Sequence, residues 1–104
     1  MYKYTVRMHV PQRRGRVPLR LTNPDIKRDS VIHISVSEAV PLGGIFGAAF
    51  RRHFGSASIT VQNITPQEGF VDFYVNVDYT QPLNIVADIS IFDPVAPESV
   101  VYGT

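Results

Sequence analysis

Cysteine is absent from this chain of 104 residues. Its absence excludes disulfide bonds, thiolate metal sites and a cysteine nucleophile, and it leaves the cellular compartment open. Long apolar runs are absent too, so no segment has the length of a membrane-spanning helix. The first residues, Met1-Tyr2-Lys3-Tyr4, lack the apolar centre of a secretory signal. We therefore expect a protein of the cytoplasm or of a particle interior, with the choice between them open.

Basic residues are missing from the second half of the chain. Residues 55–104 contain six acidic residues and no lysine or arginine, which gives a net charge of −6. Residues 1–54 contain all ten basic residues against three acidic ones, which gives +7, although the whole chain carries only +1. Such asymmetry indicates an anionic partner, or copies that meet plus to minus. The alternative is that the two halves interleave in one sheet and their charges mix.

Alternation of apolar and polar residues is the main structural signal. It predicts strands over three segments: 2–10, 31–37 and 57–62. Pro18 cannot donate a backbone hydrogen bond, so residues 17–21 are expected at a sheet edge or in irregular extended chain.

The clearest alternation lies in the last third of the chain. Segments 70–79 and 83–92 flank Thr80-Gln81-Pro82, which predicts a hairpin in which paired residue numbers sum to about 162. One face of this hairpin would be apolar and would include Phe73. The other face would combine charged and polar residues with exposed aromatic ones: Phe70, Tyr74 and Phe92.

Residues 41–54 have the only helical period in the chain. Apolar residues recur there at intervals of three and four: Leu42, Ile45, Phe46, Ala49 and Phe50. Pro41 suits the first turn of a helix and Gly55 suits its end. The predicted core unites this helix with the strands: Val36, Phe46, Phe50, Phe73, Val75 and Ile89.

These elements predict an α+β fold. One mainly antiparallel sheet of five or six strands would carry the helix, about residues 41–54, on one face. The alternative is a small open β-barrel or sandwich with one helix. Residues 1–92 would form a single domain, and residues 93–104 an extended C-terminal arm.

Arginine-rich residues 12–20 are expected to form a loop with a binding role. They include four arginines: Arg13, Arg14, Arg16 and Arg20. Because the guanidinium fork suits phosphate and carboxylate groups, nucleic acid and an acidic protein surface are both candidate partners. A solvated basic loop without a partner is the third interpretation.

Catalytic chemistry has little support in the sequence. Asp72 and Asp88 would lie diagonally on the outer face of the hairpin, and a carboxylate pair can perform acid–base work. No third ligand converges on them, and the three histidines are scattered: His9, His33 and His53. We therefore expect no enzyme, no cofactor and no metal site.

The functional prediction is a non-enzymatic structural or assembly subunit. It would self-associate, or dock in a larger assembly such as a virus-like particle, through its sheet face, its charge asymmetry and its arm. Pro94 and Pro97 keep the arm extended, and Ser99–Tyr102 would lie along a sheet edge or groove of another subunit, with the sheet edge at Pro18 as one acceptor. The partner-binding residues would be Arg13, Arg14, Arg16, Arg20, Phe70, Tyr74, Phe92, Val100, Val101 and Tyr102. The alternative function is a small nucleic-acid-binding module that uses residues 12–20.

Overall fold

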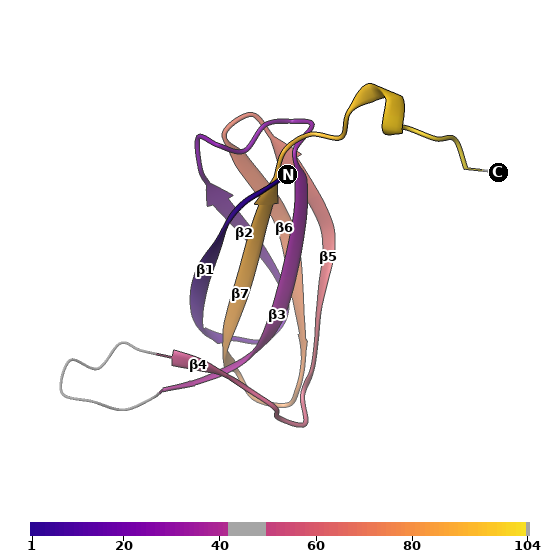
Figure 1. The fold of residues 1–104 in the computed structure, drawn as a ribbon. Coiled ribbons are helices and arrows are strands. Elements are labelled where there is room, and N and C mark those ends of the chain that lie inside the picture. Colours follow the sequence, from indigo (N-terminus) through magenta and orange to yellow (C-terminus); the bar gives the residue numbers. More distant parts are fainter. Residues whose placement is uncertain (42–49, 104) are drawn as a thin grey trace.

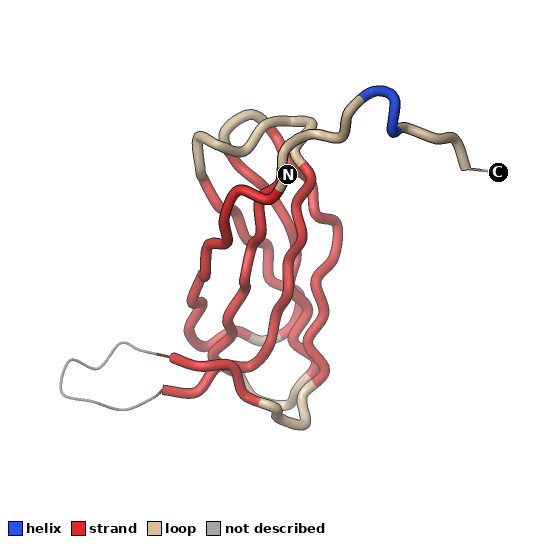
Figure 2. Tube along the Cα trace, viewed as in Figure 1, coloured by secondary structure: helices blue, strands red, loops and turns tan. Residues whose placement is uncertain are grey.

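The structure, a computed structural model, describes residues 1–41 and 50–103. Most of these residues are in strands (Figure 1; Figure 2). In chain order the strands are β1 (Tyr2–Arg13), β2 (Gly15–Thr22), β3 (Val31–Pro41), β4 (Phe50–His53), β5 (Ser58–Gln67), β6 (Phe70–Asp78) and β7 (Leu83–Phe92). The described part contains one helical element, the 3₁₀ turn η1 (Pro97–Ser99), and has no helix of the length and apolarity needed to cross a membrane.

The strands form two antiparallel sheets. The four-stranded sheet has the order β1-β7-β3-β4, and the three-stranded sheet has the order β2-β6-β5. The sheets pack face to face, and β3 lies beside β5, so the sheets approach each other along one side like half of a barrel (Figure 1). Most consecutive strands belong to different sheets, so the chain crosses repeatedly from one layer to the other.

The hydrophobic core lies between the two sheets. Alternate residues of β6 and β7 face inward and are almost completely buried: Val71, Phe73, Val75, Val77, Ile85, Ala87, Ile89 and Ile91. The predicted burial of Phe73, Val75 and Ile89 is confirmed, and Val36 packs against this cluster. The other two predicted core positions, Phe46 and the side chain of Phe50, lie outside the described part of the chain.

The predicted helix over residues 41–54 is wrong, and so is the α+β fold class. Pro41 ends β3, and Phe50–His53 form β4, which pairs antiparallel with the end of β3. The residues between them, 42–49, lie outside the described part. The alternative prediction, an open barrel or sandwich with one helix, is wrong in the same respect, because it also placed a helix at residues 41–54.

The side chain of Arg52 supplies a physical reason for this correction. Its guanidinium donates hydrogen bonds to the backbone carbonyls of Ser35 and Val36 and to the Asp88 carboxylate. These contacts, together with the ladder between β3 and β4, fix residues 50–53 in a strand. Tertiary contacts of this kind override a local period, since the period alone is a weak determinant of structure.

The predicted hairpin of residues 70–79 and 83–92 is wrong in its pairing. β6 pairs with β2 and β5, whereas β7 pairs with β1 and β3. The inward residues of both strands are those that alternation indicates. They meet across the core from opposite sheets instead of lying side by side in one sheet.

Residues 23–30 close one end of the sandwich. Asn23 N–H donates to the Gly69 carbonyl at 2.9 Å, and Gly69 N–H donates to the Ile26 carbonyl at 2.8 Å. Ile26 is fully buried although its neighbours in the sequence are charged. At the same end Asp93 N–H donates to the Met1 carbonyl at 2.8 Å, which holds the start of the arm beside the start of β1.

Candidate interaction site

Residues 94–103, which we call the C-terminal arm, run away from the sandwich (Figure 1). Val100, Val101 and Tyr102 expose 57%, 88% and 94% of their surface. Such exposure is unusual for three consecutive apolar residues, because each would be stabilised by burial. The arm therefore presents apolar side chains to solvent, not to the core of its own domain.

Proline sets the extended course of this arm. Pro94 and Pro97 each fix φ and lack a backbone N–H, so neither a strand ladder nor an α-helix continues through them. Ala96 and Val100 both have extended dihedral angles (φ −63°, ψ 140° and φ −84°, ψ 126°). Between them η1 forms a single turn, in which Val100 N–H donates to the Pro97 carbonyl at 3.3 Å.

The outer face of the three-stranded sheet carries a second candidate surface, which we call the Arg–aromatic face. Its members are Arg16 and Arg20 of β2 and Phe70, Asp72 and Tyr74 of β6. The Arg16 guanidinium lies 3.8 Å from the centre of the Tyr74 ring, and the Arg20 guanidinium lies 4.1 Å from the Phe70 ring. These are diagonal neighbours, because Arg16 is directly opposite Asn76 and Arg20 is opposite Asp72.

An ion pair between Arg20 and Asp72 lies in the middle of this face. Arg20 Nε and Nη2 donate to the two carboxylate oxygens of Asp72 at 2.6 and 3.0 Å. This pairing lowers the pKa of Asp72 and raises that of Arg20, because each charge is hydrogen-bonded to the other. Beside the pair is an open hollow of about 540 Å³, which Tyr74 and Asn63 also line. The face therefore offers prearranged aromatic and guanidinium groups around a shallow depression.

Four predicted partner residues thus share one surface: Arg16, Arg20, Phe70 and Tyr74. Phe92 does not join them, since it lies on the outer face of the other sheet. Its ring packs against Tyr2, with ring centroids 5.5 Å apart, and against His33, with centroids 4.8 Å apart. The expected aromatic patch is therefore divided between opposite faces of the molecule.

The predicted arginine-rich loop over residues 12–20 is mostly strand. Arg13 ends β1, Gly15 begins β2, and Arg14 alone separates them. Gly15 has a φ of 75°, which suits glycine in so tight a turn. Arg13 donates to the Pro11 carbonyl and Arg14 to the Tyr79 carbonyl, at 2.6 and 3.1 Å. These two arginines lie at the end of the sandwich, apart from the stacked pair on the sheet face.

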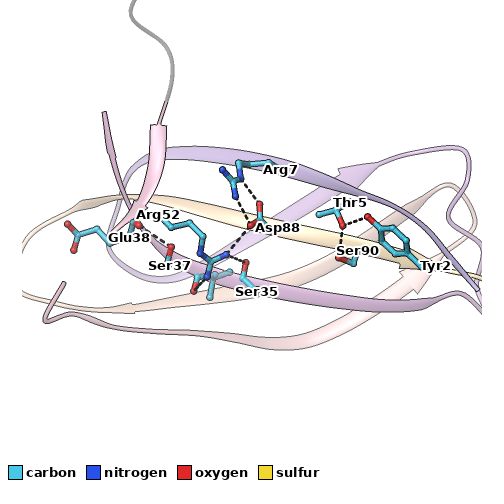
Figure 3. A network of polar contacts seen from close by, with 10 residues as sticks. Tyr2, Thr5, Arg7, Ser35, Ser37, Glu38, Arg52, Asp88 and Ser90 are labelled. Atoms are coloured by element: carbon cyan, nitrogen blue, oxygen red, sulfur yellow. Dashed lines mark hydrogen bonds and ion pairs between the residues drawn. The ribbon is translucent and has the colours of Figure 1, made fainter. Parts of the chain in front are cut away.

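The carboxylates of Asp72 and Asp88 do not form a pair. They belong to different sheets, and both side chains point outward, so the core lies between them. Asp88 instead accepts hydrogen bonds from Arg7 at 2.7 and 3.0 Å and from Arg52 at 3.0 Å (Figure 3). Arg7, more than Arg52, lowers the pKa of Asp88. Across residues 1–41 and 50–103, no three histidine or acidic side chains gather as a metal site.

The network around Asp88 was not anticipated from the sequence. Beside it on the same outer face, Thr5 Oγ1 is hydrogen-bonded to Ser90 and to the Tyr2 hydroxyl, each at 2.8 Å (Figure 3). The alternation of apolar and polar residues in each strand indicates that these polar side chains point outward, and this is the part of the network that the sequence could have predicted. Finding the network also requires the strand order, because Arg7 reaches Asp88 from the adjacent strand β1, whereas Arg52 reaches it from β4, across β3.

Comparisons of the chain with protein-family models, with curated proteins and with solved structures found no match. The two surfaces of this chain that bear on function are the exposed apolar arm and the Arg–aromatic face.

Proposed function

We propose that this protein is a non-enzymatic structural subunit that associates with copies of itself through its C-terminal arm. The observation that carries the proposal is the exposure of Val100, Val101 and Tyr102 on an extended segment. Full burial of such side chains contributes about 1.5–3 kcal/mol each before the cost of ordering the arm. Contiguous exposed apolar residues commonly mark an interaction site.

The composition of the Arg–aromatic face supports a role in protein association. Arginine, tyrosine and phenylalanine are enriched in protein interfaces, and arginine and tyrosine often dominate their binding energy. In this chain, stacking and the Arg20–Asp72 ion pair hold these side chains before any partner arrives. A partner would therefore lose less conformational entropy on binding there than on a surface of free side chains.

Deletion of residues 94–104 tests the proposal. The truncated chain is expected to fold with near-native thermal stability, because the core residues lie between Val10 and Ile91. Its mass by light scattering coupled to size exclusion should fall relative to the full chain at equal concentration. A full-length variant with Val100→Asp and Val101→Asp should behave like the truncation, and Glu98→Gln serves as the matched arm control. An unchanged mass in both altered chains would overturn the proposal.

Nucleic-acid binding is the second candidate function. Its support is the placement of Arg16 and Arg20 beside aromatic rings on one exposed sheet, an arrangement suited to stacking and phosphate contact. Asp72 weakens that support, because it pairs with Arg20 in the middle of the face. Replacing Arg16 and Arg20 with alanine should weaken binding to single-stranded DNA if this function holds. The affinity of the unaltered chain should then fall steeply with salt.

A further inference from the structure

The two sheets have four edge strands, and three of them are protected within the described structure. β5 lies beside β3, so the other sheet covers its edge. β4 contains four residues, which offer few groups for pairing. β2 carries Pro18, which lies opposite Tyr74 in the regular register of β2 and β6. Because proline has no backbone N–H, the side of β2 that faces away from β6 has one hydrogen-bond donor fewer. Short strands and prolines are common means of protecting sheet edges.

β1 is the open edge. It is twelve residues long, and between Tyr2 and Val10 it contains no proline. Its ladder partner, β7, occupies one side, and no further strand of the described sheet occupies the other. The inward side chains along it, Tyr4, Val6 and Met8, are only partly buried. β1 therefore presents a row of backbone donors and acceptors next to an incompletely covered apolar seam.

We propose that the C-terminal arm of a second copy binds along this edge of β1 as an added strand. This inference rests on the proposed function and specifies its acceptor site. Residues 99–102 suit a strand, since Val100 is already extended and valine and tyrosine favour sheets. Backbone hydrogen bonds would supply affinity, and alternate arm side chains would cover the half-buried seam, as in other cases of strand addition.

Charge is compatible with this placement. Glu98 is the only charged side chain in residues 94–103. The outward row of β1 carries Lys3 and Arg7, so an arm on this edge brings its carboxylate toward a cationic strand. In β1, these cations already neutralise acidic groups of the same copy, Asp93 and Asp88. The electrostatic contribution of Glu98 is therefore steering, and the affinity comes from backbone pairing and apolar burial.

The position of the arm favours a second copy over its own β1. Asp93 is fixed to Met1, next to the first residues of the same strand. To reach the free side of its own β1, the arm would have to reverse direction across that strand directly after Asp93. Pro94 and Pro97 restrict such a reversal, and the arm instead extends outward (Figure 1). Ten residues span at most about 33–36 Å when fully extended, and the single turn η1 shortens this reach, which still leaves enough length to contact a neighbouring molecule.

Hydrogen–deuterium exchange tests the acceptor. Of the amides of residues 3–9, every second one points away from β7. These amides should exchange about three- to tenfold more slowly in the associated full chain than in the chain lacking residues 94–104, because a net hydrogen bond of about 0.5–1.5 kcal/mol corresponds to that factor. Amides of residues 58–67, in the covered edge strand β5, are the internal control and should not change. Protection of β1 should disappear on dilution. Protection that persists at all dilutions would place the arm on its own β1 and overturn the inference.

Disulfide trapping gives a second, independent measurement, because the natural chain has no cysteine. A chain with Val101→Cys is mixed under oxidising conditions with a separate chain carrying Thr5→Cys or His9→Cys, two positions along β1. Mixed dimers with at least one of these are expected. The matched alternative is Thr65→Cys, beside the hollow of the Arg–aromatic face. Trapping at Thr65→Cys alone would overturn the β1 site in favour of that hollow.

The two proposals can fail separately. If arm deletion lowers the mass while β1 shows neither protection nor trapping, the assembly function stands and the β1 acceptor is wrong. If Thr5→Cys chains trap each other equally well without the arm, β1 pairs edge to edge and the acceptor proposal is again wrong. If arm deletion leaves the mass unchanged, the assembly function itself fails and the acceptor proposal fails with it.

Discussion

Arg52 Nη1 lies 3.0 Å from Asp88 Oδ2, and this ion pair crosses β3 to join edge strand β4 to central strand β7 (Figure 3). Arg7 reaches the same carboxylate from β1 on the other side. Both arginines come from the basic first half of the chain and Asp88 from the acidic second half. The remaining ion pairs of the described residues join the halves in the same way: Arg20–Asp72, Lys3–Asp93 and the N-terminus–Asp93. Interleaved strands therefore account for much of the charge asymmetry along the sequence.

Substitution of Asp88 tests the strength of this network. Asp88→Asn is expected to lower the free energy of unfolding by about 1–2 kcal/mol, because two guanidinium groups lose their charged acceptor. Only 20% of the Asp88 side chain is exposed, so water screens the pairs less than at a fully exposed site. Urea denaturation at pH 7 measures the change. Glu98→Gln, on the exposed arm, is the control and should change stability by less than about 0.5 kcal/mol; an equal effect of both would contradict the prediction.

Acid should weaken the fold through the same carboxylate. The pKa of Asp88 in the folded chain lies below its ordinary value of 3.8, chiefly because Arg7 donates to its charged form. A lowered folded pKa contributes stability that is fully present above the ordinary value and is lost as the pH falls from there through the folded pKa. The urea concentration at the midpoint of unfolding of the unaltered chain should therefore decrease when the pH is lowered below about 4. Asp88→Asn should flatten that drop, and an unchanged slope would contradict this assignment.

Phe73 and Phe54 offer a matched comparison of burial. Phe73 exposes 2% of its surface, and Phe54 is fully exposed. Phe73→Ala should cost about 3–5 kcal/mol of unfolding free energy, because it leaves a cavity between the sheets. Phe54→Ala should change it by less than about 0.5 kcal/mol, since surface positions seldom matter more. Thermal and urea denaturation of both variants check the pair, and similar costs would contradict the assignment of the core.

Alternation identified the inward residues of β6 and β7 but not their partners. A period of two tells which side chains share a face of a strand, and Phe73 and Ile89 are both buried as it indicates. It carries no information on which strand lies alongside. The short connection between β6 and β7 suggested a hairpin, whereas the chain uses it to cross between sheets. Only the complete set of strand pairings decides between these two solutions.

The predicted helix failed for a related reason. Its apolar period falls mainly on residues 42–49, and its ends at Pro41 and Phe50–His53 belong to two paired strands. Arg52 would lie in the last turn of such a helix, where a cation complements the helix dipole, but it instead reaches the carbonyls of β3. A cation that complements a helix dipole and one that binds sheet carbonyls have the same sequence signature. Which role applies depends on whether a strand is available alongside.

The Arg–aromatic face could be anticipated only in pieces. Arg16 and Arg20 were singled out for their charge, and Phe70 and Tyr74 for their exposure on a strand. Nothing local in the sequence pairs these residues, because about fifty positions separate β2 from β6. The register of β2 against β6 brings them to diagonal positions. The extended course of the arm, in contrast, is set locally by its prolines.

The last prediction concerns the coupling between Arg16 and Tyr74. A guanidinium 3.8 Å from a ring centre at an exposed site should contribute a coupling energy of about 0.5–1 kcal/mol. A double-mutant cycle with Arg16→Ala and Tyr74→Ala, measured by urea denaturation, gives this energy directly. The cycle of Arg16→Ala with Phe70→Ala is the control, because Phe70 stacks with Arg20 instead. Equal coupling in both cycles would mean that Arg16 is not held on Tyr74. The Arg–aromatic face would then lose the prearranged geometry that supports its proposed role in protein association.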